Sequence, residues 1–260
     1  MIREALRGRA GRLIAAARGW AGQLLPATCP GCGAVVADGG ALCAACWSAL
    51  AFLVPPLCAR CALPLPQTAG DAAAAPVCAG CRADPPPFAR AHAAVRYDDA
   101  SRALVLRLKH GDGSELAPVL AGLMLQARAG DGPPPDVVAA VPLHPLRRIR
   151  RRYNQAGLVA AAIAQRLRRP YLPLVVRRRR ATRSQGGLSA SQRRRNVAGA
   201  FDADRALLAG RRVLLVDDVM TTGATLRAAA RACLKAGAAE VEVLVFARAL
   251  PPGTGGTVRG

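Results

Sequence analysis

Cysteines spaced as C-x-x-C constrain this chain more than any other feature of its sequence. Of nine cysteines in 260 residues, eight lie before residue 82 and form four pairs: Cys29/Cys32, Cys43/Cys46, Cys58/Cys61 and Cys78/Cys81. One pair can present two thiolates to a metal ion from a tight turn, and two pairs complete a tetrahedral site of four sulfurs. Ten residues separate the first two pairs and sixteen the last two, which are loop lengths that suit a zinc ribbon.

Disulfide bonds are the alternative use of these cysteines. The cytosol keeps thiols reduced, and a redox-active C-x-x-C usually occurs once in a chain rather than four times. We therefore predict two structural zinc ions, each held by two consecutive pairs, with a crossed pairing as the alternative. Four sulfur ligands leave no open position on the metal, so neither ion is expected to be catalytic. The ninth cysteine, Cys233, falls on the apolar face of an expected helix and is predicted to lie in the core.

The segment before the first cysteine, residues 1–27, carries leucines and Trp20 at helical spacing with arginines between them. This pattern predicts a basic amphipathic helix that either docks on its own protein or lies on a membrane surface. No apolar run approaches the roughly 20 residues that a membrane span requires, and no signal-peptide core is present. The sequence therefore predicts a cytoplasmic protein without a membrane span.

From residue 90 onward, short apolar runs alternate with helical patterns. Expected strands are 91–98, 137–141, 171–176, 212–216 and 241–247, and expected helices begin near residues 99, 114, 154 and 225. Strands without polar alternation, joined by helices, favour a mostly parallel sheet covered on both faces. We therefore predict an α/β domain over residues 85–250, preceded by a double zinc ribbon over 28–84 and followed by a flexible tail at 251–260. The polar stretch 178–195 is interpreted as a mobile loop.

Positive charge is unevenly distributed. The formal net charge is +21, and residues 137–201 contain 16 arginines without one aspartate or glutamate. A solvated surface normally mixes charges of both signs, so this block favours contact with a polyanion. General use of arginine in place of lysine, which occurs only at Lys109 and Lys235, is the alternative.

The stretch VLLVDDVMTTGATL, residues 213–226, joins a buried strand to two carboxylates and a threonine-glycine loop. Amides at a helix start, with hydroxyls and a glycine beside them, can cradle a phosphate. A carboxylate pair repels phosphate but accepts hydrogen bonds from ribose hydroxyls. The sequence therefore predicts a sugar-phosphate site, with Asp217 and Asp218 at the ribose and the following residues at the 5′-phosphate: Thr221, Thr222, Gly223, Ala224 and Thr225.

This stretch resembles the phosphoribosyl pyrophosphate (PRPP) motif of type I phosphoribosyltransferases. Together with the cysteine pairs, further segments make nearly the whole chain similar to the ComF family of competence proteins. These segments are LKHGD at 108–112, VPLH at 141–144, RRYNQ at 151–155 and SQGGLSASQRRRNVAGAF at 184–201. Arg152 stands where the family usually has a glycine. The resemblance implies a sheet of the type I phosphoribosyltransferase type.

The resemblance also implies the remaining parts of a site. Strand-end residues and neighbouring cations would face the pyrophosphate: Pro142, Leu143, His144, Lys109 and Arg151. Mg²⁺ would accompany the diphosphate and keep most of its ligands from substrate and water. The loop that covers the site in the transferases would correspond to a segment containing Gln185, Arg193 and Asn196.

Three functions are compatible with these residues. The first is a ComF-like protein that binds PRPP or a related phosphoribosyl ligand, associated with DNA uptake or processing, with single-stranded DNA and competence proteins as candidate partners. The second is an active phosphoribosyltransferase acting on an unidentified base or amine, although no base-recognising hood is evident. The third is a zinc-ribbon scaffold with a relic transferase domain, against which the intact acid pair and threonine loop argue.

Overall fold

A computed structural model describes residues 26–37, 39–66, 75–110, 113–130, 132–143, 154–180 and 189–251. The predicted N-terminal helix, most of the C-terminal tail, and three predicted site residues lie outside the described residues; the three are His144, Arg151 and Gln185.

The centre of the molecule is a four-stranded, fully parallel sheet in the order β1-β6-β5-β2. Its strands are β1 (Arg90–Arg96), β6 (Glu240–Arg248), β5 (Arg212–Met220) and β2 (Val137–Ala140). The alanines, valines and leucines of these strands are buried with little alternation, as expected for a sheet covered on both faces. The predicted α/β class with a mostly parallel sheet is confirmed.

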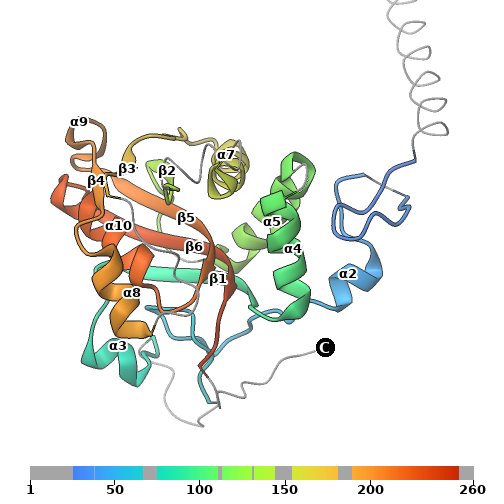
Figure 1. Cartoon of the computed structure of the whole chain (residues 1–260), viewed down its shortest axis with the longest axis horizontal. Helices are drawn as coiled ribbons and strands as arrows, with labels where there is room; N and C mark the ends of the chain where they lie inside the picture. Colours follow the sequence, from blue (N-terminus) through green and yellow to red (C-terminus); the bar gives the residue numbers. More distant parts are fainter. Residues whose placement is uncertain are drawn as a thin grey trace, which may run out of the picture.

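Helices cover both faces of this sheet, as Figure 1 shows. On one face lie α4 (Asp99–His110), α5 (Gly113–Arg128) and α7 (Gln155–Leu167), whose apolar residues share a core with the sheet. On the other face lies α10 (Ala224–Lys235), which buries Cys233 completely in a second core. Burial raises the pKa of this thiol to about 12, in keeping with the predicted core role.

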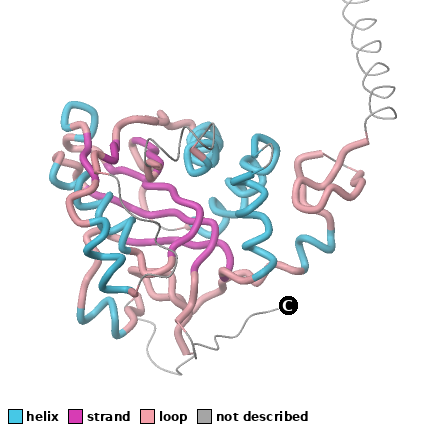
Figure 2. The backbone as a smooth tube through the Cα atoms, in the orientation of Figure 1, coloured by secondary structure: helices cyan, strands magenta, loops and turns pink. Residues whose placement is uncertain are grey.

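The predicted strand over residues 171–176 was wrong in extent. Tyr171 forms only a single parallel bridge with Val138, and the strand that follows is β3 (Val176–Arg178). It pairs antiparallel with β4 (Phe201–Ala203) in a separate two-stranded sheet beside the central one (Figure 2). The prolines at positions 170 and 173 have no N–H to give to a ladder, which explains the interruption.

The predicted loop over residues 178–195 contains the start of a helix, α8 (Ala190–Val197). Ser189 and Gln192 form a capping box, in which the serine hydroxyl accepts from the Gln192 amide and the glutamine side chain accepts from the Ser189 amide. The sequence SASQ carries this signal, but the polarity of its surroundings favoured a loop. A further short helix, α9 (Arg205–Leu208), begins at the Asp204 cap.

The cysteine-rich region runs around the domain. Its two short helices, α2 (Ala44–Ser48) and α3 (Ala79–Ala83), lie on opposite sides of the sheet domain in Figure 1. Between them, residues 51–53 run along β1: the Leu53 amide donates to the Ala94 carbonyl, and Phe52 bridges Val95. This segment covers part of the free edge of the sheet. Within the described segments, no helix has the length and apolar character needed to cross a membrane.

Candidate functional site

All four strands of the sheet are parallel, so their carboxyl ends meet at one edge. At this edge β5 passes into residues 221–223 and then into α10, which supplies a helix N-terminus. Pro142 and Leu143 follow β2 after Val141, and they lie at the same edge because β2 pairs with β5. Open α/β sheets bind their ligands in this position.

Asp217 and Asp218 occupy the last part of β5, and both are partly buried. Asp217 Oδ1 accepts a hydrogen bond from the Asp218 amide at 2.9 Å, and Asp218 Oδ1 accepts from the Val219 amide at 2.8 Å. Burial raises the pKa of the Asp217 carboxyl well above its ordinary value, and the adjacent charge of Asp218 raises it further. The two carboxyl groups can thus accept hydrogen bonds, but ionising both of them at once is unfavourable.

Lys109, near the end of α4, brings the compensating charge. Its Nζ lies 2.6 Å from Asp218 Oδ2, and both side chains are largely shielded from solvent, at 23% and 18% exposure. The resemblance implied a place for Lys109 beside the pyrophosphate; in this structure its ammonium contacts the acid pair. This charge also opposes the rise in the pKa of Asp217.

The loop after the acid pair has the backbone geometry that its glycine permits. Gly223 has a φ of +73°, in the left-handed region, and forms the N-cap of α10. Thr222 is exposed, and its Oγ1 accepts from the Ala224 amide at 3.4 Å. The five predicted phosphate residues, 221–225, therefore form one turn at the start of a 12-residue helix.

Three polar residues near this edge were missed by sequence reasoning. Arg248, the last residue of β6, is buried and donates to the backbone carbonyls of Met220 and Thr221. Asn154 donates from Nδ2 to the Val141 carbonyl, but its buried Oδ1 has no hydrogen-bond partner, and neither has the buried Nε2 of Gln155. In the sequence, Arg248 could have been noticed as a charged residue at the end of an apolar strand. Asn154 and Gln155 could have been noticed as members of the RRYNQ motif.

The remaining predicted loop residues are placed only in part. Arg193 and Asn196 lie in α8, which packs against α10. Only the backbone position of Arg193 is described, whereas the Asn196 carbonyl accepts a hydrogen bond from Arg180 Nη2 at 3.2 Å. Residues 181–188, between β3 and α8, lie outside the described residues.

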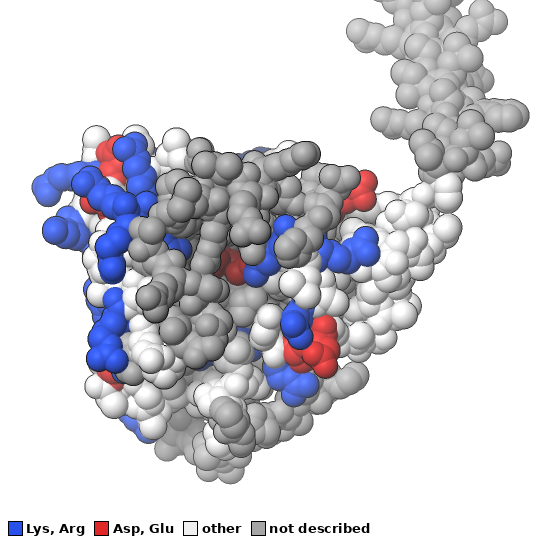
Figure 3. Space-filling view, in the orientation of Figure 1, with Lys and Arg blue, Asp and Glu red and all other residues white. Residues whose placement is uncertain are grey.

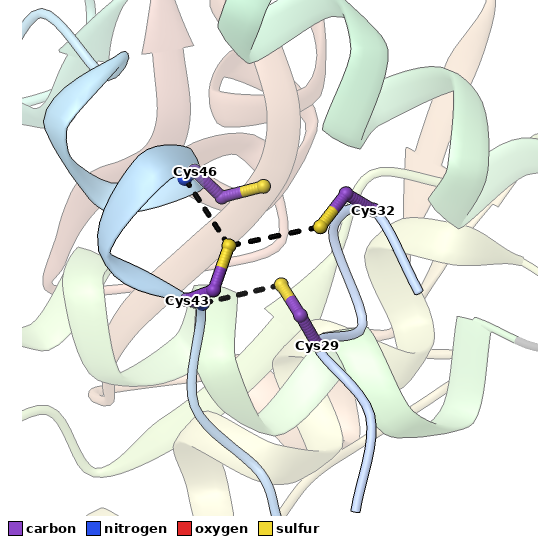
Figure 4. Close-up of side chains that lie close together, drawn as sticks. All are labelled: Cys29, Cys32, Cys43 and Cys46. Atoms are coloured by element: carbon purple, nitrogen blue, oxygen red, sulfur yellow. Dashed lines mark hydrogen bonds between the residues drawn. The ribbon is translucent and has the colours of Figure 1, made fainter. Parts of the chain in front are cut away.

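The eight paired cysteines form two tetrads. Tetrad 1 is Cys29, Cys32, Cys43 and Cys46, and tetrad 2 is Cys58, Cys61, Cys78 and Cys81; within each, the sulfurs lie within 4.8 Å of one another. Consecutive pairs thus share a site, as predicted, and the crossed pairing is excluded. Sulfur-sulfur distances of 3.6 Å in tetrad 1 (Figure 4) and 3.7 Å in tetrad 2 match the roughly 3.8 Å of a tetrahedral ZnS₄ centre.

Backbone amides favour thiolates within both tetrads. Burial opposes ionisation of Cys29, but amide donors led by that of Cys43 outweigh it and lower the pKa to about 6. The same balance, with the Cys78 amide as the leading donor, lowers the pKa of Cys58 to about 7. Burial raises the pKa of Cys61 to about 11, and the charge of the neighbouring Cys58 thiolate raises it further. A bound cation would neutralise this repulsion. The donor set therefore fits a closed structural zinc site.

Comparison with known proteins agrees with this architecture. Residues 21–82 match the family model of the double zinc ribbon domain, and residues 154–252 match that of the phosphoribosyl transferase domain. The chain is thus a protein that joins a double zinc ribbon to a phosphoribosyltransferase-type domain. It is 37% identical over 199 residues to the DNA utilization protein YhgH of Salmonella typhi, covering 75% of this chain and 85% of that protein. The chain belongs to the ComF family, together with the YhgH proteins.

Two further likenesses cover less. Competence protein F of Haemophilus influenzae is 41% identical over 117 residues, which is 44% of this chain and 51% of that protein. Among solved structures, the glutamine PRPP amidotransferase of B. subtilis is 26% identical and overlaps 49% of this chain and 25% of its own length, with a TM-score of 0.34.

Proposed function

We propose that this protein binds PRPP, or a related phosphoribosyl ligand, at the carboxyl edge of β5, in a role in DNA utilisation or uptake. One observation carries the proposal: two adjacent carboxylates lie in the last part of the central parallel strand β5, and a hydroxyl-rich helix start follows directly after that strand. The names of the YhgH proteins and of competence protein F support the biological context.

Each part of the site has a role in this proposal. Asp217 and Asp218 accept hydrogen bonds from the ribose hydroxyls, and residues 221–225 receive the 5′-phosphate through amides and hydroxyls. Lys109 exchanges its contact with Asp218 for one with the pyrophosphate, which carries more negative charge. Mg²⁺, where bound, would neutralise the diphosphate oxygens. Pro142 and Leu143 would line the pyrophosphate side.

Isothermal titration of PRPP with Mg²⁺ tests the proposal. Asp218→Asn should weaken binding roughly 10- to 100-fold, because charge-assisted hydrogen bonds contribute about 1.5–3 kcal/mol each. The matched control is Asp202→Asn, which removes a carboxylate of β4 that is paired with Arg179 and lies outside the proposed site. This substitution should leave the affinity for PRPP unchanged. Absence of binding by the wild-type protein would refute the proposal.

A pH series gives a second test of the acid pair. The pKa of Asp217 is raised by burial and by Asp218, so the affinity for PRPP should increase as pH rises through this pKa and the carboxylate becomes charged. Lys109 holds the pKa down, so Lys109→Gln should move the pH profile to higher values. A profile that stays in place would show that the ammonium does not act on the acid pair.

The same site could transfer the phosphoribosyl group, as the match to the phosphoribosyl transferase model suggests. In that reaction an acceptor nitrogen forms a bond to ribose C1′ while the bond from C1′ to the pyrophosphate oxygen breaks, and pyrophosphate leaves. A screen of bases and amines for pyrophosphate release measures this activity directly. Release that depends on an acceptor and is lost in Asp217→Asn would establish catalysis.

Single-stranded DNA binding is a second candidate function, favoured by the cationic side of the molecule formed by β3, β4, α8 and α9 (Figure 3). The contacts of individual arginines on this side indicate which of them could contact DNA. Arg179 is paired with Asp202 of β4, and Arg180 donates to two carbonyls at the end of α8, so both are engaged in contacts within the protein. Arg194 and Arg195 on α8 are exposed and better placed to contact phosphates.

Fluorescence anisotropy with an oligo-dT probe tests whether DNA affinity depends on these two arginines or on the net positive charge of the protein. Arg194→Ala combined with Arg195→Ala should weaken binding and reduce the salt slope by about 1.4, since each phosphate contact on a single strand contributes about 0.7. The control is the double replacement of Arg102 and Arg107, two exposed arginines on α4. An affinity that is insensitive to salt, or an equal loss in both variants, would exclude this face as a DNA site.

A further inference from the structure

Arg248 joins the proposed phosphate loop to the second cysteine tetrad. Its Nη1 donates to the carbonyls of Met220 at 3.1 Å and Thr221 at 2.5 Å, and also to that of Ala249, whereas its Nε donates to the carbonyl of Cys61 at 3.0 Å. The residue is 8% exposed, so its charge lies inside the protein, where these carbonyl dipoles compensate it. One guanidinium therefore fastens two segments that are far apart in the sequence.

These contacts set the direction in which the loop amides point. A trans peptide unit is planar, so its C=O and N–H point in opposite directions. Because the carbonyls of Met220 and Thr221 turn toward Arg248, the N–H groups of the same peptide units, those of Thr221 and Thr222, turn away from it. Amides oriented in this way at a helix start are the donors that a phosphate group requires.

Cys61 lies in a metal-binding turn that backbone hydrogen bonds close. The Cys61 and Ala62 amides both donate to the Cys58 carbonyl, and Ala62 adopts a φ of +54°, which is unusual for a residue with a side chain. Two thiolates of this turn belong to tetrad 2, and the metal that fits the tetrad would hold the turn shut. The carbonyl that receives Arg248 Nε is thus part of the metal-binding turn.

A second arginine supports the same junction. Arg227, on the first turns of α10, donates to the carbonyls of Asp84 at 2.6 Å and Pro85 at 3.2 Å, directly after tetrad 2. The loop at residues 221–223 is therefore bracketed on both sides by arginines that contact the second half of the cysteine-rich region. Tetrad 1 has no such contact with the loop among the described residues.

We propose that Arg248 is a positioning residue for the phosphate loop and that closure of tetrad 2 around its metal controls the affinity of the loop for a phosphate group. The proposal rests on the proposed phosphoribosyl site. It makes tetrad 2 a determinant of ligand binding as well as of stability, and it predicts that metal loss there weakens binding at the phosphate end of the ligand.

Two probes separate the ends of the ligand: ribose 5-phosphate, which needs the loop, and inorganic pyrophosphate with Mg²⁺, which does not. Arg248→Lys should weaken ribose 5-phosphate binding about tenfold and leave pyrophosphate binding within twofold, because a single ammonium cannot reach the carbonyls on both sides. Arg128→Lys is the matched control: Arg128 is also 8% exposed, but it pairs with Glu242 near the opposite end of β6. Equal loss for both probes in Arg248→Lys would overturn the positioning role.

Hydrogen-deuterium exchange tests the junction without any ligand. In the full-length protein, peptides covering residues 219–226 should exchange several-fold faster in Arg248→Lys and in the double variant Cys78→Ser/Cys81→Ser, but not in Cys43→Ser/Cys46→Ser. Peptides covering β2 should stay better protected than residues 219–226 in all three variants, which distinguishes opening of the loop from general unfolding. Unchanged exchange at residues 219–226 would refute the junction. If the wild type binds neither probe, the phosphoribosyl proposal fails, and this exchange measurement still decides whether the loop depends on tetrad 2.

Discussion

The two cysteine tetrads share one motif but have different surroundings. In tetrad 1, Cys29 is buried but Cys32 is exposed, and Gly31 lies so close to Leu104 of α4 that an added Cβ would meet it. In tetrad 2, Cys58 and Cys81 are buried. The four cysteines of each tetrad therefore determine only the metal site. The residues between and after them determine whether this site lies at the surface or packs into the sheet domain.

The chemistry of the two contacts differs as well. Tetrad 1 is attached mainly through apolar side chains, since Leu42 and Leu50 join the core formed with α4 and α5. Tetrad 2 adds hydrogen bonds from three arginines to backbone carbonyls, namely Arg60, Arg227 and Arg248. Directional bonds fix position more narrowly than apolar contact, so changes at tetrad 2 should reach the ligand site more readily.

The largest expected effect comes from removing two sulfurs from each tetrad in turn. Cys78→Ser/Cys81→Ser should lower the free energy of unfolding of the sheet domain by about 4 kcal/mol, in the range reached when a metal site within the core is lost. Cys43→Ser/Cys46→Ser should cost about 1–2 kcal/mol, because Leu42 and Leu50 can still pack. Urea unfolding followed by circular dichroism measures both. Equal losses of unfolding free energy in the two double variants would show that the tetrads contribute equally to the stability of the sheet domain.

Arg227→Ala should have the next largest effect. The side chain is 14% exposed and makes three hydrogen bonds to Asp84 and Pro85, so its loss should cost about 2 kcal/mol. Arg231→Ala, an exposed position one turn further along α10, should change the stability by less than about 0.5 kcal/mol. A thermal melt of each zinc-loaded protein makes the comparison. If the two variants melt alike, the arginine does not anchor tetrad 2.

The order of metal release should follow exposure. With a chromophoric chelator in excess, tetrad 1 should release its zinc at least about tenfold faster than tetrad 2, because a chelator can reach the exposed Cys32 before any part of the domain opens. Two phases of equal amplitude are expected. The fast phase should be absent from Cys43→Ser/Cys46→Ser, and its survival there would reverse the assignment.

Much of the fold could be predicted from the sequence because its signals are local. Helices α4, α5, α7 and α10 were each predicted within about two residues, since their apolar spacing and stop signals lie in the helices themselves. The tetrads were predicted equally well, because the C-x-x-C spacing encodes its own geometry. The loop between β5 and α10 followed from a single stretch of residues.

The errors and omissions have a different origin. The strand predicted over 171–176 depended on pairing partners, and a window that contains Pro173 cannot reveal that β3 would pair with β4. Arg248 looks like the ordinary polar end of an apolar strand, and only the folded chain brings Cys61, 187 positions away, to its guanidinium. The contact of Lys109 with Asp218 is equally non-local. Polar contacts between residues far apart in the sequence produce no regular spacing of residues from which they could be predicted.

The smallest expected effect compares a glycine inside each tetrad. A Cβ at Gly31 would meet Cys46 Sγ, Leu42 Cδ2 and Leu104 Cδ2, each at 3.1 Å, so Gly31→Ala should press tetrad 1 away from α4 and cost about 1 kcal/mol. A Cβ at Gly80, within α3, meets nothing within 4 Å, so Gly80→Ala should stabilise that helix by about 0.5 kcal/mol. Chemical unfolding with zinc present measures both. Changes of opposite sign in the free energy of unfolding would show that tetrad 1 packs too closely against α4 to accept a methyl group. Tetrad 2, in contrast, is held by hydrogen bonds that an added methyl group does not disturb.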